Sequence, residues 1–218
     1  MTIDYPMASI RFHKFAIEGM QDIQKQTEKS KAFYFPYVEE KRGVADKLLI
    51  ELAKNAAVVI TDDYPTYFVP QMTAEAKGSI QTTYELVDSN GLLPIRIAEK
   101  EYVRAHDFRR FMHKNIEDFL VEVPEKDPLE YLNLKFDEKL LEPIFKKYDL
   151  IDFNQINTQD FLNNLNVDKS VEVSDVVGGY NAAKSRLELF AKKGFNDYSK
   201  LRSHPSEDAS SQLSPYFH

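Results

Sequence analysis

The sequence contains no cysteine among its 218 residues. This absence excludes a disulfide, a thiolate nucleophile, an iron–sulfur cluster and a cysteine-ligated zinc site. It also lacks any apolar run near the roughly 20 residues that a membrane span needs, and charged residues make up 29% of the chain. The basic region, apolar stretch and small-residue cleavage site of a secretory signal are missing from its start. We therefore expect a globular, cytoplasmic protein that has no membrane partner.

Positive charge is scarce as well. The formal net charge of −7 argues against a chain-wide electrostatic footprint for nucleic acid. The imbalance is confined to residues 1–170, because acidic and basic residues balance in residues 171–218. The basic residues of this last part are Lys184, Arg186, Lys192, Lys193, Lys200 and Arg202. Any DNA binding would have to be local.

Segments of helical and strand-like periodicity alternate in the first part of the chain. Ser9 is a suitable cap for the first helix. The stretch AAVVIT at residues 56–61 is a continuous apolar run, which is typical of a strand buried on both faces of a parallel sheet. The alternation predicts an α/β layer structure. The expected helices are residues 9–28, 44–55 and 69–77, and the expected strands are residues 32–38, 56–61 and 81–87.

The rest of the chain has a different pattern. Residues 102–120 have the apolar stripe of one more helix. Several prolines and short helical patterns indicate an irregular connector at residues 121–170. A long helix is expected to begin at Gly178-Gly179 and to end at Gly194. The predicted parts are an α/β domain at residues 1–120, the connector at 121–170 and a helical region at 171–218.

Polar clusters outside the C-terminal region have ordinary explanations beside functional ones. Residues 61–65, TDDYP, follow a predicted strand, where α/β sheets place ligand groups, but no glycine-rich phosphate loop accompanies them, so they also fit a polar turn. His106 and His113 are too far apart on one helix for a shared metal ion. Basic side chains near residues 109–114 could contact phosphate or simply lie in solvent. We assign no catalytic residue and no metal ligand.

The segment at residues 210–215, SSQLSP, is a stronger candidate. It offers three hydroxyls and several backbone N–H groups ahead of an expected helix, whose N-terminus can bind an anion such as phosphate. Serines before a helix are also ordinary N-caps. The residues themselves leave both interpretations open.

The C-terminal region resembles the start of the flavin-binding domain of the DNA photolyase and cryptochrome family, with most likeness to the class II branch. The resemblance rests on Gly178-Gly179-Tyr180-Asn181-Ala182-Ala183, Leu187, Phe190, Tyr198, Arg202 and the stretch ASSQLSPYFH at residues 209–218. In that family a tyrosine twelve residues before a Thr-Ser-x-Leu-Ser-Pro-Tyr motif contacts FAD, and the motif holds the diphosphate. The resemblance therefore implies an FAD site formed by Tyr198, Ser210, Ser211, Gln212, Leu213 and Ser214. Two positions depart from the pattern: Ser210 stands where threonine is usual and Ala209 where glycine is usual.

The resemblance also implies a fold. It is α/β, with a partial Rossmann-like parallel sheet and flanking helices, followed by the first helices of an all-α FAD-binding domain. The family's sheet has five strands in the order 3-2-1-4-5, and the three expected here correspond to the third, fourth and fifth. Residues 32–38 should then be separated from residues 56–61 by two missing strands. We expect an incomplete chain that lacks the first strands and most of the helical domain.

The activity implied by the resemblance is a carbon–carbon lyase reaction. Reduced FAD transfers an electron, under light, to a pyrimidine dimer flipped out of damaged DNA, and the dimer splits. The helices that carry the family's flavin-reducing tryptophans are not in this chain, which has no tryptophan. We expect this chain alone to be inactive. The alternatives are a cryptochrome-like FAD-binding photoreceptor, a non-catalytic interaction module, or a gene remnant.

Overall fold

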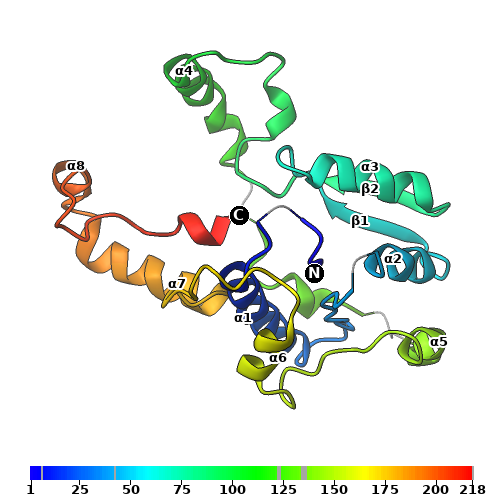
Figure 1. Cartoon of the computed structure of the whole chain (residues 1–218). Coiled ribbons are helices and arrows are strands. Elements are labelled where there is room, and N and C mark those ends of the chain that lie inside the picture. Colours follow the sequence, from blue (N-terminus) through cyan, green and yellow to red (C-terminus); the bar gives the residue numbers. More distant parts are fainter. Residues whose placement is uncertain (6, 42, 122–123, 134–136, 218) are drawn as a thin grey trace. The chain divides into compact units, whose positions relative to one another are not determined.

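The computed structural model describes the whole chain except residues 6, 42, 122–123, 134–136 and 218 (Figure 1). The chain divides into two compact units. The first unit consists of Met1–Val44, Tyr131–Asp137 and Lys147–His218, and the second consists of Ala45–Glu130 and Glu138–Lys146. Each unit therefore joins segments that are far apart in the sequence.

Helix α1 (Ile10–Thr27) organises the first unit. The Ser9 hydroxyl accepts a hydrogen bond from the Phe12 N–H at 3.5 Å, so Ser9 caps this helix and the predicted helix at residues 9–28 is confirmed. Both α6 and α7 contact α1. The later helical elements of this unit are α6 (Thr158–Asn164), α7 (Tyr180–Leu189), a π-helical turn (Phe190–Gly194), α8 (Tyr198–Leu201) and a 3₁₀ turn (Ser214–Phe217).

The apolar core of the first unit forms between α1, α6 and the chain segments beside them. Ile17 and Leu162 are almost completely buried, at 0% and 1% exposure. Full burial of such a side chain stabilises a fold by about 1.5–3 kcal/mol. Residues 151–165, within the predicted connector, therefore contribute to this core. Its buried members are Ile10, Ile17, Val38, Ile151, Phe153, Leu162 and Leu165.

The second unit contains a two-stranded parallel sheet. Strands β1 (Val58–Asp62) and β2 (Thr83–Val87) pair in register from Val58 opposite Thr83 to Asp62 opposite Val87. Helix α3 (Val69–Ser79) makes the crossover that a parallel pair requires, and α2 (Ala45–Ala53) precedes β1 (Figure 1). This arrangement confirms the predicted α/β class with a parallel sheet and flanking helices.

One prediction about β1 is wrong. The apolar run suggested burial on both faces, yet Val58 and Ile60 are 39% and 59% exposed. Alternate residues of a strand share a face, so these two side chains lie on the same side of the sheet. A covering layer for this face is missing from the described part of the chain, and the run therefore predicted the strand but not its burial.

The predicted strand at residues 32–38 is also wrong, since these residues have neither helix nor strand. The Pro36 carbonyl accepts a hydrogen bond from the Ile151 N–H at 3.2 Å, and the Tyr37 carbonyl accepts one from the Met1 amino group at 2.5 Å. The bonds thus reach scattered partners instead of one neighbouring strand. Pro36 itself has no N–H to contribute to a ladder.

The predicted helix at residues 102–120 is confirmed over its middle, as α4 (Ala105–Asn115) followed by a 3₁₀ turn (Ile116–Phe119). Among the described residues, every helix is too short or too polar to cross a lipid bilayer. The remaining short elements are α5 (Glu142–Phe145) and 3₁₀ turns at Ile95–Ile97, Pro128–Tyr131 and Glu138–Leu141.

Candidate functional site

The predicted serine-rich site lies in the first unit as an irregular loop at residues 208–214, which we call the serine loop. Ala209 anchors it, with only 4% of its surface exposed. Gly194, at the end of the π-helical turn, is also buried, and a Cβ atom there would lie 3.6 Å from the Ala209 carbonyl oxygen. The serine loop is therefore packed against the turn that follows α7.

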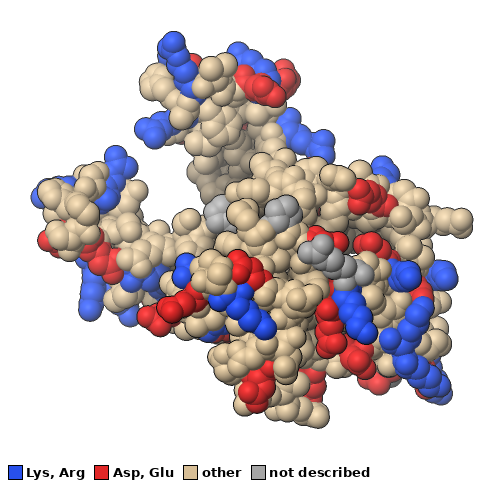
Figure 2. Space-filling view, in the orientation of Figure 1, with Lys and Arg blue, Asp and Glu red and all other residues tan. Residues whose placement is uncertain are grey.

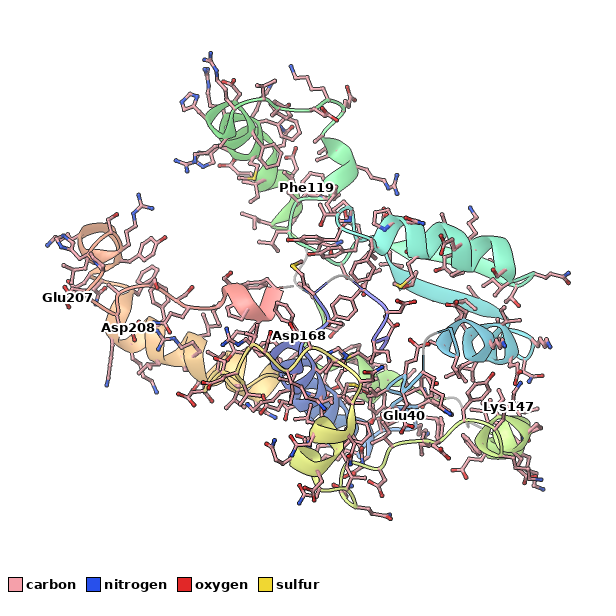
Figure 3. The ribbon with its side chains drawn as sticks, viewed as in Figure 1. Glu40, Phe119, Lys147, Asp168, Glu207 and Asp208 are labelled. Carbon is pink, nitrogen blue, oxygen red and sulfur yellow. The ribbon has the colours of Figure 1, made fainter. Side chains whose placement is uncertain are left out.

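Arg186 of α7 holds the serine loop through three hydrogen bonds. Its Nε donates to the Ser211 carbonyl at 3.1 Å, and its Nη2 donates to the Ser210 carbonyl at 3.3 Å and to the Asp208 carboxylate at 2.6 Å. The Arg186 side chain is 19% exposed, and Figure 3 shows Asp208 beside α7. The Gln212 amide also donates to the Asp208 carboxylate, at 2.5 Å.

This role of Arg186 was not predicted from the sequence, where Arg186 is only one of several basic residues. Arg186 and its partners are 22 to 25 residues apart, so no local pattern connects them. The buried Ala209 gave a weak signal, since an apolar residue among polar ones indicates a packed position. It did not indicate what holds the loop.

The donor groups of the serine loop remain available to a ligand. The N–H groups of Ser210, Ser211, Gln212 and Leu213 donate to no described residue, and neither do the hydroxyls of the three serines. Ser210, Gln212 and Ser214 are exposed, and Ser211 and Leu213 are half-buried. Gln212 adopts a positive φ of 53°, in the left-handed region. Amides and hydroxyls with no internal acceptor are suitable donors to a phosphate oxygen.

Tyr198, the remaining predicted site residue, lies at the start of α8. Its ring meets Phe190 edge-on at 5.8 Å between centroids, and the Arg202 guanidinium lies 5.6 Å from the Tyr198 centroid. Tyr198 is 40% exposed. Neither a hydrogen bond nor a ring contact joins Tyr198 to the described residues of the serine loop. The five loop residues are thus consecutive in one loop, and Tyr198 lies on the separate helix α8.

The helix expected after the serines is a single 3₁₀ turn. The Tyr216 N–H donates to the Leu213 carbonyl at 2.9 Å, which closes the turn. The Tyr216 hydroxyl donates to the Val177 carbonyl at 2.8 Å, and its ring lies 5.3 Å from that of Phe15 on α1. The far end of the serine loop is therefore attached to α1 and to the segment before α7.

The paired glycines at the start of α7 fit closely against α1. A Cβ atom on Gly178 would lie 2.0 Å from the Phe15 carbonyl oxygen, and Gly179 has φ +94°. The Glu18 carboxylate accepts a hydrogen bond from the Gly178 N–H at 2.7 Å, and the Asp22 carboxylate accepts one from the Asn181 N–H at 2.9 Å. Negative charge at a helix N-terminus stabilises it, so α1 fixes the position of the helix that carries Arg186.

The polar cluster after β1 bonds mostly to itself. Asp63 pairs with Arg96 at 2.6 Å, and the Ser89 hydroxyl donates to Asp62. Burial acts to raise the pKa of Asp88, but hydrogen bonds from Ile95 and Asn90 outweigh it and hold that pKa below its usual value. These contacts support the polar-turn interpretation. A pocket of about 410 Å³ lies beside the cluster in the second unit, between apolar side chains of α3 and Ile95.

The α4 candidates are exposed. His106 lies 3.6 Å from the neighbouring Asp107, and within the described ranges no three His, Asp or Glu side chains gather as metal ligands would. Arg109, Arg110 and Lys114 all point into solvent, which fits a solvated helix face. Figure 2 shows acidic and basic side chains interspersed along the segment of α7 and α8.

Comparison with known proteins gives two relatives that match essentially the whole chain. One is the deoxyribodipyrimidine photo-lyase of Methanothermobacter thermautotrophicus, 25% identical over 219 residues, covering 100% of this chain and 44% of the relative. The other is the deoxyribodipyrimidine photo-lyase of Potorous tridactylus, 24% identical over 217 residues, covering 97% of this chain and 37% of the relative. The chain is similar, over essentially its whole length, to part of two photolyases.

The match is to part of each relative, because the chain spans less than half of their length. No family model matches the chain. The parallel pairing of β1 with β2 agrees with the resemblance, which makes them the adjacent fourth and fifth strands of the sheet.

Proposed function

We propose that this chain is part of a light-dependent, FAD-containing photolyase that splits cyclobutane pyrimidine dimers in damaged DNA. The whole-chain similarity to two deoxyribodipyrimidine photo-lyases is the observation that carries the proposal. The serine loop supports it, since its free amides and hydroxyls suit a diphosphate. The protein would be a carbon–carbon lyase of the cytoplasm, and this chain alone would be inactive.

In this proposal Ser210, Ser211 and Ser214 donate hydroxyl hydrogen bonds to the FAD diphosphate, and the backbone N–H groups of residues 211–213 add to them. Tyr198 provides an aromatic contact. Bound FAD would supply light absorption and electron transfer, which no protein side chain offers. We assign no catalytic residue to this chain.

The first test is a titration of the chain with FAD, followed by quenching of flavin fluorescence. We expect a Kd weaker than about 1 μM, which corresponds to less than roughly 8 kcal/mol of binding free energy, because these residues contact only part of the cofactor. A double change of Ser210 and Ser211 to alanine should weaken binding further. Ser206→Ala is the matched control, since the exposed Ser206 has no partner among the described residues.

The second test uses the protein translated from the whole gene. We expect a yellow, FAD-bearing protein that splits thymine dimers under blue light and not in the dark. A colourless protein at full length would contradict the proposal. Stable FAD binding without repair under light would favour the cryptochrome-like photoreceptor instead.

A further inference from the structure

The hydrogen bonds that Arg186 makes in this structure go to the serine loop. Its Nε and Nη2 already donate to two carbonyls and a carboxylate, and its charge is balanced by Asp208 at 2.6 Å. A planar guanidinium is well suited to such multiple bonds, because its donors point in fixed directions. Through these bonds Arg186 acts on the backbone of the serine loop, and so on the groups that the backbone offers to an anion.

The geometry of the peptide bond determines which way the N–H groups of the serine loop point. In a trans peptide the carbonyl of one residue and the N–H of the next lie in one plane and point in opposite directions. Because Arg186 holds the carbonyls of Ser210 and Ser211, it turns the N–H groups of Ser211 and Gln212 away from itself. These two N–H groups donate to no described residue, and Gln212 is exposed.

The two amides are consecutive, which is the arrangement that forms an anion-binding concavity. The Asp208 carboxylate reinforces it, since it accepts hydrogen bonds from both Arg186 and the Gln212 side chain. Without Arg186, the Ser210 and Ser211 peptides would be free to rotate, and their amides would have to be ordered when the anion binds.

We infer that Arg186 is a positioning residue, which aims the N–H groups of Ser211 and Gln212 at the diphosphate of FAD without touching it. This inference rests on the proposed FAD site. According to this inference, Arg186 on α7 contributes to the affinity for FAD in addition to the serine hydroxyls.

The experiment compares variants of the whole flavoprotein by FAD affinity and by the ³¹P chemical shifts of bound FAD. Arg186→Gln should weaken FAD binding by about 10- to 100-fold, the range expected for hydrogen bonds to a charged group, and should move the ³¹P signals. Arg186→Lys should also weaken FAD binding, because one ammonium group cannot make the several hydrogen bonds of the planar guanidinium. This variant keeps the positive charge and tests the inference if Arg186→Gln does not fold.

A matched control separates the positioning role from a simple loss of charge. Lys184→Gln removes one positive charge from the same helix at an exposed position. It should leave the ³¹P shifts of bound FAD unchanged. If the wild type binds FAD and the Arg186 variants have the same FAD affinity and the same ³¹P shifts, the inference about Arg186 is wrong and the proposed FAD site is unaffected. A wild type without FAD would refute the proposed function itself.

Discussion

Gly178 lies so close to α1 that there is no room for a side chain at this position. A Cβ atom would lie 2.0 Å from the Phe15 carbonyl oxygen, a backbone atom that cannot swing aside. We expect Gly178→Ala to lower the free energy of unfolding by about 1–3 kcal/mol, as overpacking does. Urea unfolding followed by circular dichroism would measure it, because the chain has no tryptophan.

The control for this glycine is Gly78 in α3. A Cβ atom there would meet no heavy atom within 4 Å. Gly78→Ala should raise the stability by about 0.5–1 kcal/mol, because alanine favours a helix more than glycine does. Equal effects of the two substitutions would contradict the close packing of Gly178 against α1.

A second residue-scale prediction concerns His13, which is fully buried in α1 at 0% exposure. Burial lowers the pKa of His13 from 6.5, and the hydrogen-bonded Ser9 carbonyl only partly opposes this. The unfolded state therefore binds a proton more readily, so this contribution to stability is complete above about pH 6.5 and is lost as the pH falls below it.

The measurement is the urea midpoint of the wild type and of His13→Gln at pH 7 and pH 5. The wild type should lose more stability over this interval than the variant, which cannot titrate at this position. His113→Gln, a change of an exposed histidine on α4, should behave as the wild type does. Identical pH dependence in all three proteins would refute the argument.

Single residues were predictable where the signal is local. Ser9 was predicted as a cap, and its hydroxyl oxygen accepts a hydrogen bond from the N–H of Phe12, only three residues away. The hydroxyls of the serine loop and the resemblance predict an FAD site there, and that site stays a prediction. The roles of Arg186 and Asp22 were not predictable, since each acts on a segment that lies distant in the sequence and near only in the folded chain.

At the scale of elements, predictions that depend on local sequence patterns are right, and those that depend on distant parts of the chain are wrong. The helices α1 and α2 follow apolar stripes of helical period, and both were predicted; α3 was predicted from its place between two strands. Residues 32–38 have the composition of a strand, but a strand also needs a neighbour with which to share a ladder of hydrogen bonds. Whether a neighbouring strand is present depends on the fold, and it cannot be predicted from the composition of residues 32–38.

The start of α7 allows a test at this scale. Asp22 accepts a hydrogen bond from the Asn181 N–H at 2.9 Å and places negative charge at the helix N-terminus. Asp22→Ala should cost about 1 kcal/mol, as the loss of a helix cap does. Thermal unfolding followed by circular dichroism measures the change. Glu188→Ala, an exposed change on the same helix, should stay within about 0.5 kcal/mol of the wild type, and a similar loss in both variants would contradict the cap.

At the scale of the whole molecule, charge predicts how this chain behaves toward DNA. Non-specific binding comes almost wholly from Lys and Arg side chains that neutralise phosphates. The chain has a net charge of −7, and the charges of residues 171–218 balance. We therefore expect the isolated chain to bind undamaged duplex DNA with a Kd weaker than about 10 μM at physiological salt.

Fluorescence anisotropy of a labelled duplex at two salt concentrations measures this affinity. Exposed Arg109 and Arg110 on α4 form one local cationic group available to phosphate, and we expect that reversing both to glutamate abolishes the remaining binding. A Kd below about 1 μM at physiological salt would contradict the argument from charge. Binding that survives the double reversal would place the contact elsewhere, and the basic residues of α7 and α8 would then be the next to change.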